Sequence, residues 1–400
     1  MKRLLAFLLV LVTLLSLCAC GAEDKKASAE KKTNTKATEA DITNLEGLYK
    51  DHDPYFGDMH NHSNSGGRSD GKVPLVNWPD LVMAPKDMDF AAIVDHKQTS
   101  HMRGEDWDDT LYLGGSELGT TMLDEHLEQG NMHYNMIFTD PDKMEELLRE
   151  NEEFNLHEDT EKNPGFNTFK YAKFQISRFR EVVAQIREKG GFFVMVHPLY
   201  SSYLKSSETL DYWMGDYTGF EVYTGTSNGY TMAYERNMDA YNMWVKMLNL
   251  GKIVFATCGS DNHRYSDVNT LSVIYATERK ADAWLEKIRA GNFTAGPVGI
   301  RMAMGDTCTG GQTDFAGKRL TIAVGDFHSQ AMKKDHTYRL EVYDENGKVF
   351  EETLSGSEMQ YFAIDAKDCR YYRAIVYDVT EEYIYAVGNP IWNTKYLTQE

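Results

Sequence analysis

Two histidines lie two positions apart in residues 57–63, a short segment that reads GDMHNHS. If this segment forms a β-strand, His60 and His62 point to the same face, because side chains alternate between the two faces of a strand. Both imidazoles can then reach one metal ion, and Asp58 can orient them through hydrogen bonds. A His-x-His pair is a weak signal by itself, so the interpretation depends on further ligands elsewhere.

Further candidate ligands sit at the ends of apolar segments that read as strands. They are Asp95 and His96 after DFAAIV, Glu117 after TLYLGGS, His133 at the start of HYNMIF, His197 after GGFFVMV, and Asp261 and His263 around IVFATCGSDNH. Taken alone, each has an ordinary interpretation as a core or surface residue. Together they predict a polynuclear site for two to three divalent metal ions. Nitrogen and oxygen ligands without thiolates favour Zn, Mn or Fe.

Helical patterns alternate with these strands and indicate an α/β fold. Residues 169–189 carry apolar side chains at helical spacing and end at Gly190, and residues 233–250 do the same before Gly251. Glycine directly after such a pattern is a helix-ending signal. Strands that alternate with helices predict parallel pairing in a barrel or an open sheet, with reactive groups at the carboxyl ends of the strands.

The last part of the chain changes character after residue 295. Apolar and polar residues alternate with period two, and Asn346-Gly347 is a strong hairpin signal. This pattern predicts a small antiparallel β-sandwich over residues 296–400.

The N-terminus predicts export and lipid anchoring. Lys2 and Arg3 precede an apolar run over residues 4–17, which is short for a membrane span. The following LCACG resembles a bacterial lipobox, so Cys20 is the predicted lipidation site and residues 1–20 the signal peptide. The alternative is a plain signal peptide or membrane anchor. We expect a bacterial membrane lipoprotein on the extracytoplasmic side, held by several acyl chains.

The segment after the lipobox, residues 21–47, consists mainly of small, polar and charged side chains. Because it holds almost no large apolar group, we predict a flexible tether. The chain of 400 residues has a formal net charge of −19, which argues against nucleic acid as a partner. Cys258, Cys308 and Cys369 form no disulfide pattern, and no sequence feature sets an oligomeric state.

The ordered motifs resemble those of the PHP (polymerase and histidinol phosphatase) superfamily of metallohydrolases. They are D-x-H-x-H-S at 58–63, S-D-G at 69–71, D-H at 95–96, Glu117, His133, H-P at 197–198 and G-S-D-x-H at 259–263. The resemblance implies a distorted (β/α)7 TIM-like barrel over residues 48–295. Softer matches, among them GFEVY around Glu221 and GNPIW at 388–392, resemble the CehA/McbA branch.

Three features depart from the usual motifs. Five residues separate Ser63 from Ser69, more than is usual for the superfamily, and Lys97 follows the D-H pair in place of asparagine. Residues 140–168 are polar and Glu-rich, which indicates an inserted lid or partner surface, or an ordinary solvated face.

The resemblance also implies how the ligands are shared. His60, His62, Glu117 and Asp261 would bind one ion, Glu117 would bridge to a second ion, and the remaining ligands would complete the set. His133 and His197 belong to the second ion, and Asp70, His96 and His263 to a third. Asp58, Asp95 and Arg264 complete the predicted catalytic residues.

This site predicts a hydrolase that attacks a small-molecule substrate with a metal-bridging hydroxide. Phosphoester hydrolysis is favoured by four cations near the motifs that can bind phosphate oxygens: Arg68, Lys97, Arg103 and Arg264. The alternative for each of them is an ordinary surface charge. Carbamate, ester or amide hydrolysis, the chemistry of the CehA/McbA branch, is the alternative. It would suit an aromatic pocket of Tyr200, Tyr203, Trp213 and Tyr223. A third hypothesis is a non-catalytic lipoprotein that binds metal or a ligand.

Overall fold

The ligand-bearing strands lie side by side in one curled sheet. The structure is a computed structural model, and it describes residues 36–66, 69–123, 131–151, 172–199, 215–225, 233–264, 270–331 and 333–397. The sheet runs, in order, through β9 (Ser272–Ala276), β1 (Asp53–Asn61), β2 (Phe90–Ile93), β3 (Tyr112–Leu123), β4 (Asn131–Ile137), β6 (Phe192–Met195), β7 (Thr218–Thr224) and β8 (Val254–Gly259).

The curl brings β1 and β8 back toward each other. The two segments share one parallel bridge, between Asn61 and Asn262, and the backbone N–H of His62 donates to the carbonyl of Asn262 at 2.8 Å. The ligands that follow β1 and β8 therefore meet where this seam closes.

The prediction of parallel pairing is correct for only part of this sheet. The β1–β2, β2–β3, β6–β7 and β7–β8 pairs are parallel, whereas β4 is antiparallel to both β3 and β6, and β9 is antiparallel to β1. Residues 124–130 connect β3 to β4 without a helix-length crossover, and such a short connection joins antiparallel neighbours. β5 (Ala172–Gln175) pairs parallel with the far end of β3.

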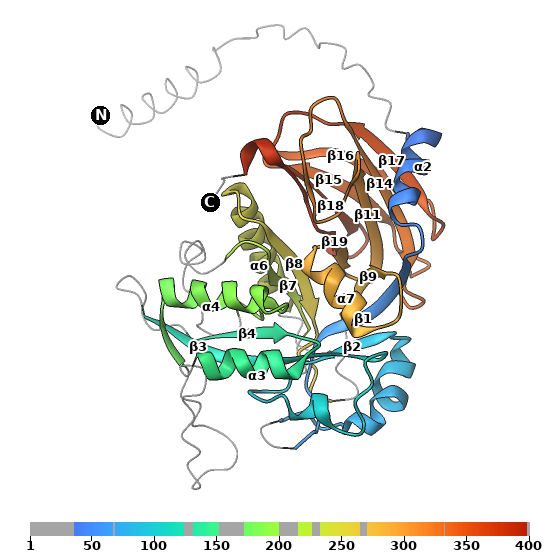
Figure 1. Ribbon diagram of the computed structural model, residues 1–400. Helices are drawn as coiled ribbons and strands as arrows, with labels where there is room; N and C mark the ends of the chain where they lie inside the picture. The colour runs from blue at the N-terminus through green and yellow to red at the C-terminus, as the bar shows by residue number, and fades with distance from the viewer. Residues whose placement is uncertain are drawn as a thin grey trace, which may run out of the picture. The chain divides into compact units, whose positions relative to one another are not determined.

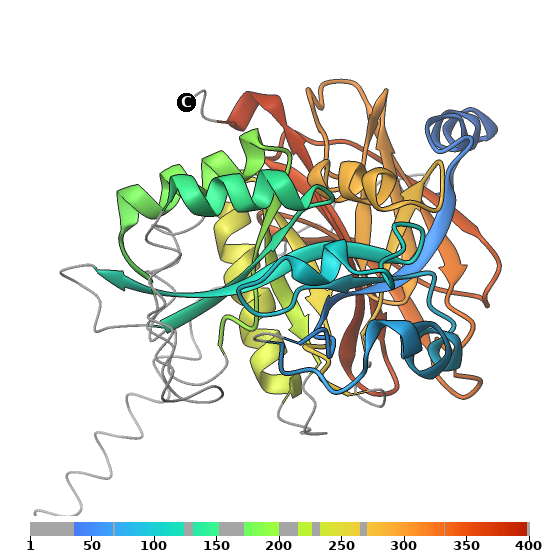
Figure 2. The ribbon, with the colours of Figure 1, turned by 60° about the horizontal axis from the view of Figure 1, so that its bottom comes forward.

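Helices cover the sheet where the sequence shows amphipathic patterns. They are α3 (Pro141–Glu150), α4 (Ile176–Glu188), α6 (Ala233–Asn249) and α7 (Ala281–Arg289). α3 and α4 lie side by side (Figure 1 and Figure 2), and α6 packs on β7 and β8. Short turns occupy the region around β2: η1 (Leu75–Asn77), the π-turn η2 (Pro79–Met83), η3 (Ala84–Lys86) and η4 (Ser100–Arg103).

The predicted helix ends are confirmed at two glycines. Gly190 and Gly251 have φ of +92° and +85°, the left-handed conformation that glycine adopts without steric cost. The next backbone N–H reaches back into each helix, from Gly191 to Ile186 and from Lys252 to Met247. These bonds satisfy carbonyls that would otherwise be unpaired at the helix end.

Residues 141–150 support the interpretation of the polar segment 140–168 as an ordinary solvated face, and not as an insertion, for this part of it. This part is the amphipathic helix α3, and its Met144 and Leu147 are fully buried in the main core. Its polar residues form only the outer face of a helix that packs on the sheet. Residues 152–168 lie outside the described residues.

The C-terminal part consists of strands, as predicted. β10 (Phe293–Ala295) pairs with β9 and β19 (Tyr383–Gly388), so the first sheet continues into β18 (Tyr371–Asp378), β15 (Tyr338–Asp344), β16 (Gly347–Thr353), β20 (Ile391–Asn393) and β13 (Gln312–Thr313). A second sheet holds β12 (Thr307–Cys308), β11 (Val298–Met304), β14 (Arg319–Phe327) and β17 (Gln360–Asp365). A 3-10 turn, η7 (Thr394–Tyr396), follows β20.

The two C-terminal layers share one apolar core, with side chains such as Ile300 and Ile322 from one sheet and Leu340 and Val376 from the other. The predicted hairpin joins β15 to β16 through Glu345 and Asn346, and Gly347 pairs with Asp344. Thr35–Glu400 forms one compact unit, and the predicted boundary at residue 295 falls inside the continuous sheet at β10.

The flexible tether predicted for residues 21–47 is wrong at its C-terminal end. Residues Glu39–Leu48 form helix α2, which Thr38 caps by accepting a hydrogen bond from the backbone of Asp41. Leu45 is fully buried beside Tyr275, and Glu46 pairs with Arg301 of β11. The composition concealed this helix because only one of its faces is apolar.

Among the described residues, no helix is long and apolar enough to cross a membrane. The predicted signal peptide and Cys20 lie outside the described residues, as do Arg68, Tyr200, Tyr203 and Trp213.

Candidate metal centre

The structure brings together all nine residues predicted as metal ligands. His60 lies on β1, Glu117 on β3 and His133 on β4, and the other ligands follow strands or stand in loops. Glu117 corrects one expectation, because β3 does not end there. It continues to Leu123, with Glu117 paired opposite Asn135 of β4. Gly115 allows the close approach of β4, because a Cβ there would lie 2.5 Å from the carbonyl oxygen of Met136.

The first ligand group contains His60, His62, Glu117 and Asp261. His62 Nε2 lies 3.0 Å from Glu117 Oε2 and 3.3 Å from Asp261 Oδ1. His60 Nε2 lies 3.4 Å from the same glutamate oxygen and 3.5 Å from the same aspartate oxygen. Two imidazole nitrogens and two carboxylate oxygens thus converge on one point, a donor set that suits a divalent ion.

The second group contains Glu117, His133 and His197. Here the other glutamate oxygen is used: Oε1 lies 2.7 Å from His133 Nδ1 and 3.1 Å from His197 Nε2. Because its two oxygens face different groups, the fully buried carboxylate of Glu117 can bridge two ions.

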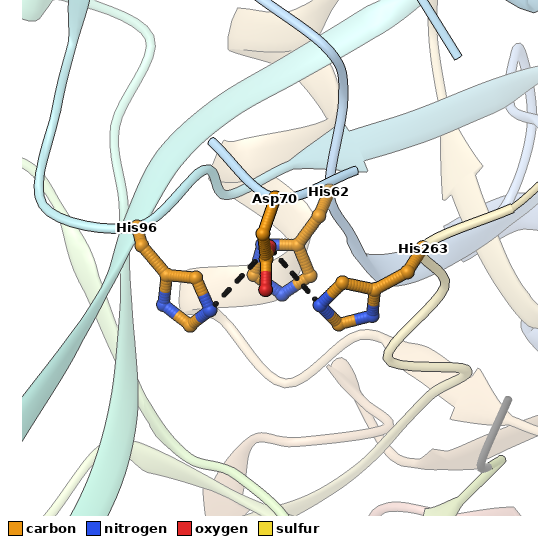
Figure 3. A group of neighbouring side chains, drawn as sticks. All are labelled: His62, Asp70, His96 and His263. Carbon is orange, nitrogen blue, oxygen red and sulfur yellow. Dashed lines mark ion pairs between the residues drawn. The ribbon is translucent and has the colours of Figure 1, made fainter. Parts of the chain in front are cut away.

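The third group contains His62, Asp70, His96 and His263 (Figure 3). Asp70 Oδ1 lies 3.1 Å from His263 Nε2 and 3.7 Å from His96 Nε2. The rings of His96 and His263 each stack against the ring of His62, with centroids 4.5 and 4.4 Å away. Asp70 therefore reaches the site despite the unusual motif spacing.

Gly71 explains how the long loop delivers Asp70. A Cβ on Gly71 would lie 2.1 Å from the carbonyl oxygen of His62, so only glycine lets the loop pass this close to β1. The backbone N–H of Lys72 donates to the carbonyl of His263 at 2.9 Å and fixes the loop on the other side.

Three residues of the site have backbone conformations that L-residues rarely adopt. His197, Asp261 and Lys97 have φ of +31°, +51° and +53°. Such residues cost about 1–3 kcal/mol each and cluster at functional sites. The first two turn a ligand side chain toward the centre directly after a buried strand.

The electrostatics of the protein alone suit imidazole–carboxylate pairing. Burial by itself lowers the pKa of His62, but Asp261 and Glu117 outweigh it and raise this pKa to about 10. Burial lowers the pKa of His96 to about 4, against the opposing effect of Glu117. At neutral pH, His96 is thus ready to act as a ligand, whereas His62 must release a proton before it binds a metal ion.

Asp58 and Asp95 hold the backbone around the ligands. Asp58 Oδ1 accepts hydrogen bonds from the backbone N–H groups of His60 and Ser260, which ties β1 to the end of β8. Burial raises the pKa of Asp58 to about 7, although these hydrogen bonds oppose the shift. Asp95 accepts from the backbone and hydroxyl of Ser63. These contacts suit a positioning role for both residues, the role that the sequence indicated for Asp58.

The predicted phosphate-binding cations occupy different settings. Arg103 pairs with Asp142 at 2.5 Å and with Glu145 at 3.3 Å, so carboxylates of α3 already compensate its charge. Arg264 is exposed next to His263, so it remains the candidate for substrate contact. Lys97 is half-buried and donates its backbone N–H to the carbonyl of Glu117. Arg68 lies outside the described residues.

Glu221 is a site residue to which the motifs gave no role. It is buried on β7, and its Oε1 lies 3.2 Å from His60 Nδ1. A buried carboxylate on an apolar strand was the available signal, since such a group needs hydrogen-bond donors.

No protein-family model matches this chain, and neither does any curated protein. Among solved structures, this chain is similar to a protein from Bacteroides vulgatus ATCC 8482, with 16% identity and a TM-score of 0.37. That structure is described as a two-domain protein containing a predicted PHP-like metal-dependent phosphoesterase. It covers 85% of this chain and 95% of its own. An engineered protein is 12% identical with a TM-score of 0.16, over 55% and 59% of the two chains. At these TM-scores, we infer neither fold nor function from the two structures.

Proposed function

We propose that this protein is a metal-dependent phosphoesterase of the PHP type. The observation that carries the proposal is the joining of three ligand groups through shared residues, Glu117 between two groups and His62 between two. A non-catalytic metal carrier has no need for adjacent ions, whereas ions that share a carboxylate suit phosphoryl chemistry.

The ligands can serve two or three ions. The imidazole Nε2 of His62 has one lone pair, so it binds one ion and cannot bridge through the same atom. If His62 completes the group with Glu117 and Asp261, then Asp70, His96 and His263 serve the third ion with positions left for water or substrate. We expect Zn, Mn or Fe on this donor set.

When bound, the ions would activate water and polarise the phosphoryl group. The residues of the chain supply the rest. Glu117 and Asp261 would hold an ion together with His62, and the exposed guanidinium of Arg264 beside His263 can bind a non-bridging phosphate oxygen. His263, which is only part-buried at the rim, can transfer a proton to a leaving group if it does not bind an ion.

The proposal also includes the fold that the resemblance to the PHP superfamily implies. We propose a distorted (β/α)7 barrel of the PHP type, of the CehA/McbA branch, followed by a β-sandwich. The curled sheet, the meeting of β1 and β8, and the shared core of the two C-terminal layers support this interpretation.

A substrate panel tests the function directly. Protein loaded with manganese or zinc is assayed on p-nitrophenyl phosphate, bis(p-nitrophenyl) phosphate, p-nitrophenyl acetate and a p-nitrophenyl carbamate. The proposal predicts metal-dependent turnover of a phosphoester. Turnover of the carbamate or acetate alone would move the assignment to the alternative hydrolase, and no turnover with full metal content would favour the binding lipoprotein.

We also propose that Cys20 carries the lipid anchor, on the strength of the lipobox. Membrane fractionation of Cys20→Ser expressed in a bacterial host tests it. Release of the protein or stalled processing is expected, and a fully processed variant that stays membrane-bound would refute the anchor.

A further inference from the structure

Glu221 contacts residues of two different ligand groups. Its Oε1 lies 3.2 Å from the ring Nδ1 of His60, and its Oε2 accepts the backbone N–H of His197 at 2.6 Å. The hydroxyl of Thr224 donates to the same Oε2 at 2.8 Å. We propose that Glu221 is a positioning residue that holds His60 and His197, one ligand in each of the two groups joined by Glu117. The proposal rests on the proposed metal site.

The first contact determines which nitrogen of His60 can bind an ion. When Nδ1 carries the proton and donates it to the carboxylate, the lone pair is on Nε2. That nitrogen faces the ligand group, 3.4 Å from Glu117 Oε2 and 3.5 Å from Asp261 Oδ1. Glu221 thus favours the one tautomer of His60 that can coordinate a metal ion.

The second contact fixes the backbone of His197. This residue has φ of +31°, a conformation that must be stabilised by its surroundings. The short hydrogen bond from its N–H to Glu221 supplies such a restraint, and the ring Nε2 then lies 3.1 Å from Glu117 Oε1. Loss of the restraint would let the chain relax and move the ring away from its group.

The packing around Glu221 and His60 leaves no space for an additional carbon atom at Gly259. A Cβ at Gly259 would lie 2.7 Å from Glu221 Oε1 and 2.3 Å from the Cβ of His60. The glycine of the G-S-D-x-H motif therefore accommodates the His60–Glu221 pair. Among the described residues, Glu221 belongs to none of the three ligand groups, because its oxygens face Nδ1 and the backbone.

An isosteric substitution separates this role from simple packing. In Glu221→Gln, one terminal atom becomes a donor, so the side chain cannot accept from both His60 Nδ1 and His197 N. If the amide accepts from His197, its NH₂ group faces His60 and favours the wrong tautomer. If it accepts from His60, the NH₂ group opposes the N–H of His197.

The experiment measures zinc and manganese affinity of the chelator-stripped full chain by competition with a chromophoric chelator. Glu221→Gln should bind at least one ion about 10- to 100-fold more weakly than wild type, the usual effect of losing such a partner. Glu341→Gln is the matched control, because Glu341 is a buried carboxylate in the C-terminal sheet that pairs with Arg339 and Lys348. The control should keep wild-type affinity.

The outcomes are distinguishable. If wild type binds metal and Glu221→Gln binds it equally well, the positioning role is overturned and the metal site stands. If wild type binds no metal after reconstitution, the proposed function fails together with this role. Should Glu221→Gln not fold, the ¹⁵N spectrum of histidine-labelled, zinc-loaded wild type decides. A proton on His60 Nδ1 supports the role, and a proton on Nε2 overturns it.

Discussion

A single methyl group at Gly259 should disable the metal centre. In Gly259→Ala, the new Cβ would lie 2.3 Å from the Cβ of His60 and 2.7 Å from Glu221 Oε1. Carbon atoms pack at about 3.5–4.0 Å, so these neighbours must separate by more than roughly 1 Å. Both are buried, and the strand that carries His60 is paired on both sides, so the shift falls on the ligand geometry.

The expected size of the effect follows from that displacement. Overpacking of this kind costs about 1–3 kcal/mol of folding stability. A misplacement of about 1 Å in a catalytic constellation costs roughly 100-fold in rate. We therefore expect Gly259→Ala to lose about 100-fold in kcat/KM toward a phosphoester and to bind less metal than wild type.

The assay compares metal content, kcat/KM and thermal denaturation for Gly259→Ala and a glycine control. Gly47→Ala is that control, because a Cβ at Gly47 in helix α2 meets nothing within 4 Å. It should keep full activity and gain up to about 1 kcal/mol, since alanine is a better helix former. Gly259→Ala with wild-type metal content and turnover would refute the described packing of His60 against Glu221.

Three further predictions concern single residues and protons. His197→Ala should remove one metal ion and nearly all turnover, and full activity by the same assay would contradict its place in the second group. Arg264→Ala should lower kcat/KM for a phosphoester about 10- to 100-fold and leave the metal content unchanged. Arg103→Ala should have little effect on kcat/KM, because Arg103 pairs with α3. Equal effects of the two substitutions would contradict the assigned roles. Metal loading near pH 7.5 should release protons, because the pKa of His62 is raised to about 10 and the pKa of His60 is also raised. Metal affinity should therefore rise with pH. Calorimetry in buffers of different ionisation enthalpy measures the proton release, and a metal affinity that does not change with pH would contradict the prediction.

The nine candidate ligands could be named from the sequence because each motif carries its own chemistry. A histidine or carboxylate at an apolar strand has few uses without a partner, and period-two spacing put His60 and His62 on one face. The way in which the groups meet could not be read from spacing. Glu117 lies beside His133 because β3 continues past Glu117 and pairs with β4.

Positioning residues were harder to predict than ligands. Glu221 is one acidic residue among 61 Asp and Glu, and its significance appears only when the curl of the sheet brings β7 beside His60. Arg103 looked free in the sequence because its partner Asp142 is 39 residues away on α3. Helix α2 was missed because its stability comes from Leu45 and Glu46 contacting the β11 and β14 region, which no local pattern shows.

Metal stoichiometry tests the central claim most directly. Protein purified without chelators, and a second sample stripped and reconstituted with zinc or manganese, would be measured by elemental analysis against protein concentration. The three joined ligand groups predict two to three divalent ions per chain. A content near zero in both samples would contradict the metal centre and the phosphoesterase activity proposed from it.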